Sequence, residues 1–140
     1  MNTLCSHPFG TEITADDILD KMSACYSWED KYRLVIQMGK KLPIMDEALK
    51  PQSLQGLGCE SQVWLVWKKV DDCYYFSADA DSRIVKGLLA LILASIEAKT
   101  HEKLKAFNFE EYFSTMDFIN HISQSLSNDL RVIIKQIKNI

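Results

Sequence analysis

The stretch QVWLVWKKV-DD-CYYFSADADS-RIVKGLLALILASIEA, residues 62–98, decides the fold. Residues 62–70 are rich in valine, tryptophan and leucine, and residues 73–78 form a second aromatic run, so both are predicted strands. The aspartate pair at 71–72 is a turn signal that joins them into a hairpin. A two-stranded hairpin is marginal in water and needs a helix packed on it. Residues 82–98 supply that helix, because apolar side chains cover most of its circumference, as in a buried helix.

Further helices are predicted on both sides of this stretch. Thr14 can cap a helix over about residues 15–25, and Ser27 begins a clearer one that ends by Gly39. Asp81 is the expected cap of the central helix. Shorter helical pieces and a last helix are expected at 46–50, 101–106, after Asn108, at 118–122, and from Ser127 or Asn128. The sequence therefore predicts the α+β class, with a small antiparallel sheet packed against several helices.

Length and charge exclude several classes of protein. The 140 residues are predicted to form one domain, 1–140, with residues 1–13 as a loosely ordered N-terminal arm. The formal net charge is -3 and no basic block is present, which argues against nucleic-acid binding. The most apolar run, Leu88 to Ile96, is less than half as long as a membrane span, so no membrane contact is expected. No secretory signal is visible, so a cytoplasmic protein is expected.

The four cysteines, Cys5, Cys25, Cys59 and Cys73, are the first candidates for chemistry. They form no C-x-x-C pair, so neither a disulfide framework nor a zinc site is expected, and no metal is assigned. Cys25 ends an amphipathic helix and Cys73 lies in an aromatic strand, so both fit buried structural thiols. Cys5 lies in the arm and is given no role.

Cys59 differs because it follows Gly56-Leu57-Gly58, where backbone freedom rather than packing is favoured. The residues from Leu54 to Trp64 include no lysine, arginine or histidine that could lower the pKa of the thiol. The carboxylate of Glu60 would raise that pKa instead. Cys59 is therefore not expected to be a self-activated nucleophile. The residues alone leave open a sulfur carrier served by a partner, or a buried cysteine at the start of a strand.

Other polar candidates carry weaker signals. His101 or His121 could act as a base for Cys59, although nothing in the sequence connects them. Asp79 and Asp81, between the second strand and the central helix, fit a turn and a cap better than a catalytic pair.

Five segments, in order along the chain, together match one family pattern. They are His7-Pro8-Phe9-Gly10-Thr11, Trp28-Glu29-Asp30-Lys31-Tyr32, Met38-Gly39-Lys40-Lys41-Leu42-Pro43, Gly58-Cys59-Glu60-Ser61-Gln62-Val63-Trp64, and Asp79 to Gly87. With these segments the chain, from about residue 7 to its last residue, resembles the SufE-like sulfur-acceptor family. The first segment is similar to the arm of the CsdE branch of that family.

Two positions before the last helix depart from the family pattern. The family usually carries Ser-Arg-x-x-Gly-Leu, whereas this chain has Ser125-Leu126-Ser127-Asn128-Asp129-Leu130. Leu126 replaces the arginine and Asp129 replaces the glycine, so no role of that arginine is transferred. The family's Gly-Asp-Ser after the hairpin is Ala78-Asp79-Ala80 here, and only the aspartate is retained.

The resemblance implies a sulfurtransferase-type accessory protein rather than an independent enzyme. Cys59 would take sulfur as a persulfide from a pyridoxal-phosphate cysteine desulfurase of the SufS or CsdA type. It would then pass the sulfur to an iron–sulfur scaffold or another acceptor. No cofactor would be bound by this chain itself. The residues that would support the thiol loop are Gly58, Glu60, Gln62, Trp64 and Asp79.

Two alternatives stay open at this point. The chain could be a non-catalytic adaptor that activates a desulfurase, with Cys59 incidental, because no activating residue lies near the thiol in sequence. It could also be a free-standing thiol enzyme, which would need a lowered thiol pKa and turnover without a partner.

Overall fold

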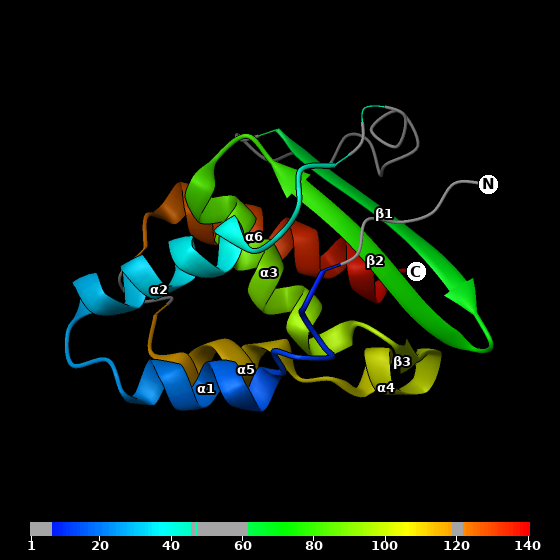
Figure 1. The fold of residues 1–140 in the computed structure, drawn as a ribbon, viewed down its shortest axis with the longest axis horizontal. Helices are drawn as coiled ribbons and strands as arrows, with labels where there is room; N and C mark the ends of the chain where they lie inside the picture. The colour runs from blue at the N-terminus through cyan, green and yellow to red at the C-terminus, as the bar shows by residue number, and fades with distance from the viewer. Residues whose placement is uncertain (1–6, 46, 48–61, 119–121) are drawn as a thin grey trace.

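The computed structural model describes residues 7–45, 47, 62–118 and 122–140. Within these ranges the chain forms six helices and one three-stranded antiparallel sheet, so the predicted α+β class is confirmed. The elements, in chain order, are α1 (Ala15–Ser23), α2 (Trp28–Lys40), β1 (Val63–Val70), β2 (Cys73–Ala80), α3 (Arg83–Ile96), β3 (Lys99–Thr100), α4 (His101–Ala106), α5 (Phe109–Met116) and α6 (Gln124–Lys138). Figure 1 shows the long hairpin β1–β2 on one side and α3 in the middle of the helices.

The predicted hairpin is present, and its turn has the geometry that the strand twist favours. β1 and β2 pair antiparallel along their whole length. Asp71 and Asp72 have φ of 51° and 67°, and two positive φ values characterise the type I′ hairpin turn. β3, which the sequence did not place, pairs with Cys73 and Tyr74 at the start of β2. The sheet order is therefore β1-β2-β3, with β2 central.

α3 is the centre of the hydrophobic core, as its composition predicts. Every residue from Leu88 to Ile96 is buried, and the helix packs on α2 and β2. Gly87 of α3 lies against α2 so closely that a Cβ there would overlap the carbonyl oxygen of Val35. This close approach explains a glycine inside a helix, where it otherwise costs about 1 kcal/mol relative to alanine.

Two helix starts differ from the prediction. Ser82, rather than Asp81, caps α3, because the carboxylate of Asp81 accepts a different backbone hydrogen bond at the start of β1. α6 begins at Gln124 with Ser123 as its cap, earlier than the predicted start at 127–128. Ser123 leads a run of alternating serines, any of which could cap a helix, so composition alone did not select the cap.

The N-terminal arm was predicted to be loosely ordered, and for residues 7–13 this is wrong. Phe9 is fully buried. His7 Nε2 lies 3.0 Å from the carbonyl oxygen of Phe76 and 3.0 Å from Glu97 Oε2, while Glu97 Oε1 accepts a 2.7 Å hydrogen bond from the Phe76 N–H. His7 of the arm and Glu97 thus contact the two backbone groups of Phe76, a residue of β2 beyond the two that pair with β3.

Two other expectations concern helices. The helical pieces expected at 46–50 and 118–122 lie mostly outside the described residues. In the described part of the chain, every helix is too short or too polar to span a lipid bilayer.

Candidate functional site

The predicted thiol, Cys59, lies outside the described residues, together with Gly58 and Glu60. The structure does describe both ends of the segment that carries them. Met45 precedes this segment and Gln62 follows it. Both are bonded to the last residues of the hairpin, and these contacts define the candidate site.

Asp79, near the end of β2, is a buried carboxylate with three partners. Its Oδ2 accepts a 2.9 Å hydrogen bond from the Met45 N–H, and its Oδ1 accepts a 2.8 Å bond from the Ala80 N–H. Lys86 Nζ, from the first turns of α3, lies 3.1 Å from Oδ1. A carboxylate that is 5% exposed needs such partners, because an unpaired buried charge is costly.

Asp81 holds the other end of the segment. Its Oδ1 accepts a 3.1 Å hydrogen bond from the Gln62 N–H, and its own N–H donates to the Gln62 carbonyl oxygen at 3.1 Å. Asp79, Asp81 and Lys86 are called the clamp below. The clamp joins the residue before the Cys59 segment and the residue after it to one end of the hairpin.

Trp64 lies on the same face of the hairpin as Asp79, directly opposite it in the strand register. Its half-buried side chain packs against Met45 and Val66, which are 1% and 7% exposed. This small apolar cluster covers the face of the sheet that points away from α3. Of the residues expected to support the thiol, the structure thus places Gln62, Trp64 and Asp79 together at one end of the hairpin.

The two histidines that the structure describes, His7 and His101, do not join this end. His101 begins α4 and its ring lies 6.0 Å from that of Tyr74, which pairs with Lys69 near the hairpin turn. Tyr74 and Asp79 are five residue steps apart along an extended strand, roughly 17 Å. His7 is engaged with Glu97 in the arm, and His121 lies outside the described residues.

Leu126 and Asp129, the two departures near the last helix, line a hollow of about 410 Å³. Trp28 and Tyr32 of α2 form another side of it, and Ser82, next to the clamp, lies at its edge. Leu126 is half-buried and Asp129 is buried. An apolar and an acidic side chain therefore face this hollow from α6, where the family pattern would place an arginine and a glycine.

Two of the other cysteines are in the described part of the chain. Cys25 and Cys73 are both half-buried, so neither belongs fully to the core as predicted. The Cys25 thiol donates to the Lys21 carbonyl oxygen at 3.3 Å. Cys5 lies outside the described residues.

The sequence interpretation missed most of the clamp. It identified Asp79 only through the family resemblance, and it assigned Asp81 to a helix cap. Met45 and Lys86 gave no separate signal. The Asp-x-Asp pattern at the end of a strand, followed by a lysine one to two turns into the next helix, is the signal that could have indicated them.

Comparisons with known proteins agree with the segments noted in the sequence. Residues 16–140 match the family model described as "SufE: Fe-S metabolism associated domain". The chain is 36% identical over 132 residues to the sulfur acceptor protein CsdE of Escherichia coli (strain K12), covering 94% of this chain and 90% of that protein. It is also 36% identical over 127 residues to an uncharacterized SufE-like protein of Rhizobium etli, covering 88% and 86%.

A solved structure supports the fold independently of sequence. The solution structure of a hypothetical protein from Thermus thermophilus superimposes with a TM-score of 0.73 at 9% identity, covering 96% of this chain and 94% of that one. At this identity the likeness concerns the fold alone. The family model, by contrast, spans most of the chain, and together with the identity to CsdE it leads to one conclusion: this chain belongs to the SufE family.

Proposed function

We propose that this protein is a sulfur acceptor that receives a sulfur atom on Cys59 from a cysteine desulfurase. The observation that carries the proposal is membership of the SufE family, combined with 36% identity to a protein named as a sulfur acceptor. The clamp supports it, because both ends of the segment that contains Cys59 are bonded to the rigid end of a hairpin. A thiol that must meet a partner's active site benefits when the residues on both sides of its segment are held in place.

The proposed chemistry is a thiol–persulfide exchange. The Cys59 thiolate attacks the outer sulfur of a persulfide on the desulfurase cysteine. A new S–S bond forms on Cys59, the old S–S bond breaks, and the desulfurase thiolate leaves with the electron pair. Sulfur then passes to a thiolate of a downstream acceptor, such as an iron–sulfur scaffold, in the same manner. Neither step needs an added oxidant or reductant.

This role suits a thiol with no cation beside it in sequence. The partner supplies an activated persulfide, so Cys59 does not need a strongly lowered pKa. We place the exchange in the cytoplasm, where thiols are kept reduced and a free cysteine stays available. Cys59 precedes Gln62 by three residues in the chain, and the Gln62 N–H is held by Asp81.

Desulfurase turnover with a series of cysteine variants tests the proposal. The wild-type protein and Cys73→Ser, a matched control on a half-buried thiol, should stimulate release of alanine from L-cysteine by a SufS- or CsdA-type desulfurase. Cys59→Ser should not stimulate it. Full stimulation by Cys59→Ser would refute the relay.

A second candidate is a non-catalytic adaptor that activates the desulfurase by binding alone. The absence of lysine, arginine and histidine from the sequence around Cys59 favours it. It predicts that Cys59→Ala stimulates turnover as well as wild type does and that no sulfur is carried. The cysteine series therefore separates the two functions.

A further inference from the structure

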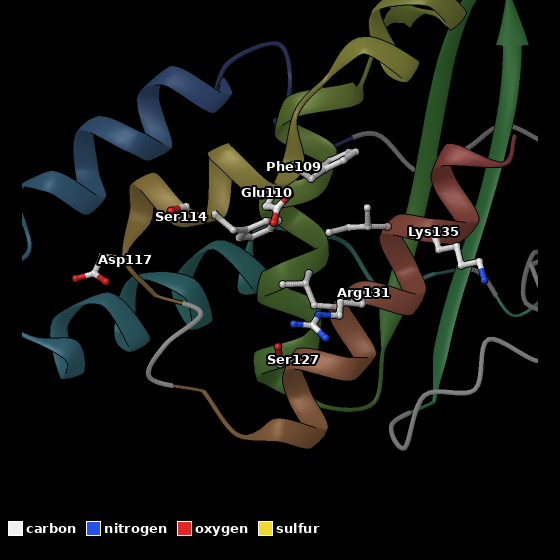
Figure 2. A pocket seen from close by; sticks show the side chains of 10 residues that line it. Phe109, Glu110, Ser114, Asp117, Ser127, Arg131 and Lys135 are labelled. Atoms are coloured by element: carbon white, nitrogen blue, oxygen red, sulfur yellow. The ribbon is translucent and has the colours of Figure 1, made fainter.

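A groove lies between α5 and α6, and no residue of the clamp lines it. α5 packs on α1 and α6 packs on α3. Between α5 and α6 lies a cavity of about 480 Å³. Figure 2 shows its lining side chains extending from α5 on one side and from α6 on the other.

The two helices line this groove with matching stripes. α6 contributes 127, 130, 131, 134 and 135, and α5 with the residue after it contributes 109, 110, 113, 114 and 117. In both sets the residues recur at helical spacing. Each stripe spans eight residue steps, which is roughly 12 Å along a helix axis. Two facing stripes of this kind form the seat that a third helix occupies in helix packing.

The floor of the groove is apolar. Phe109, Phe113 and Leu130 line it while remaining 3–4% exposed. Ile134 is half-buried, unlike Ile133 and Ile137 on the same helix, which are buried in the core. Ile134 therefore extends the apolar surface of the floor outward, in the position where an incoming aliphatic side chain would contact it.

The two walls carry opposite charge. Glu110 is exposed on the α5 wall, and Arg131 and Lys135 are exposed on the α6 wall. In Figure 2 Arg131 extends toward Ser127, and the extended Lys135 side chain points away from α5. Among the residues that the structure describes, no ion pair joins Glu110 to Arg131 or to Lys135. The negative charge therefore lies on the α5 wall and the positive charges on the α6 wall, and a ligand with a basic flank and an acidic flank could pair with both.

We propose that this groove binds one amphipathic helix of a partner protein, about two to three turns long. Its apolar residues, at i, i+3 or i+4, and i+7, would enter between α5 and α6. Acidic residues on one flank would meet Arg131 and Lys135, and basic residues on the other flank would meet Glu110. None of the described residues that line the groove belongs to the clamp, so the partner helix would contact different described residues from those that hold the ends of the Cys59 segment.

Two synthetic helical peptides test this proposal. Both carry leucines at i, i+3, i+4 and i+7 and a lactam staple on the opposite face. The mixed peptide has glutamates on one flank and lysines on the other, whereas the basic peptide has lysines on both. Binding is followed by chemical-shift titration of isotope-labelled Cys59→Ser protein under a reducing agent, so that oxidation of Cys59 or of the remaining thiols does not interfere.

The mixed peptide should bind wild-type groove residues roughly five- to tenfold more tightly than the basic peptide, since a few rim ion pairs distinguish them. Arg131→Glu with Lys135→Glu makes both walls acidic and should reverse this order. Both residues are exposed, so unchanged thermal melting verifies the fold. The proposal would be overturned if the peptides caused no saturable chemical-shift changes at residues 109–117 and 127–135. It would also be overturned if the two peptides kept the same order of affinity in the wild-type protein and in the double variant. Self-association through this face, abolished by the double variant, would also overturn it by assigning the groove to a second copy.

Discussion

Replacing Asp79 with asparagine should loosen both the fold and the attachment of the Cys59 segment. The carboxylate accepts from the Met45 and Ala80 N–H groups and pairs with Lys86 at 3.1 Å. An amide of the same shape removes the charge and places an NH₂ group against one of the two backbone donors.

The magnitude follows from these contacts. Removing one partner of a buried ion pair costs about 3–5 kcal/mol, and a buried donor left without an acceptor costs about 1–3 kcal/mol. The side chain of Lys86 is 17% exposed and reaches water in part, so the lower ends of these ranges apply. We expect Asp79→Asn to lower the free energy of unfolding by about 3–4 kcal/mol.

Asp72→Asn is the matched control. Its carboxylate lies 4.0 Å from Lys69 Nζ and is 90% exposed, so the same chemical change there should cost less than about 0.5 kcal/mol. Urea unfolding followed by tryptophan fluorescence gives both free energies. Hydrogen exchange measures the loss of the individual hydrogen bond. The Met45 amide should exchange faster in Asp79→Asn than in the wild-type protein, and at the wild-type rate in Asp72→Asn. Equal destabilisation by the two variants, with unchanged Met45 exchange, would refute the clamp.

Three further predictions concern the scaffold. Gly87→Ala should destabilise the protein by about 2 kcal/mol or more in urea unfolding, because its Cβ would overlap the Val35 carbonyl oxygen; an unchanged midpoint would contradict the α2–α3 packing. Lys138→Met should lower the free energy of unfolding by about 1–2 kcal/mol, because Lys138 Nζ donates to carbonyl oxygens at the end of α4, the shortest contact being 2.6 Å. Thermal melting measures this loss, and an unchanged melting temperature would contradict the prediction. Hydrogen bonds from Thr14 lower the pKa of Asp17 below its ordinary 3.8. The carboxylate therefore stabilises the start of α1 above pH 3.8, and this contribution is lost as pH falls through the lowered pKa. NMR titration should find the Asp17 pKa below 3.8 in the wild-type protein and still lowered, by less, in Thr14→Ala, because alanine keeps the backbone N–H that is the larger cause. An Asp17 pKa of 3.8 or above in the wild-type protein would contradict the cap.

The elements that were predictable from sequence depend on short-range patterns. The hairpin followed from two β-rich runs around Asp71-Asp72, and α3 followed from a continuous apolar stretch. Both signals lie within one element or between neighbours in sequence. The family resemblance likewise depended on contiguous segments.

The contacts that build the clamp were not predictable, because they join distant positions. The Met45 N–H and the Asp79 carboxylate are 34 residues apart, and the residues around Met45 carry no pattern that indicates the pairing. A carboxylate after a strand is also a common turn residue. Only the three-dimensional structure shows that Asp79 accepts from the chain before the Cys59 segment.

The arm illustrates the opposite error. Its composition, with Pro8 and Gly10 among polar residues, is typical of loose chain. Yet Phe9 fills the core, and His7 meets Phe76, a separation of 69 residues. A single buried aromatic residue and one histidine were enough to fix the segment, and neither has a periodicity that a sequence pattern could detect.

The central claim concerns where sulfur is carried, and peptide mass mapping tests it most directly. The protein is incubated with a SufS- or CsdA-type desulfurase and L-cysteine without reductant, then alkylated and digested. The account predicts the added mass of one sulfur atom on the peptide that contains Cys59, and none on the peptides that contain Cys25 or Cys73. An unmodified Cys59 peptide while the protein still stimulates the desulfurase, or sulfur on Cys25 or Cys73 instead, would contradict the account.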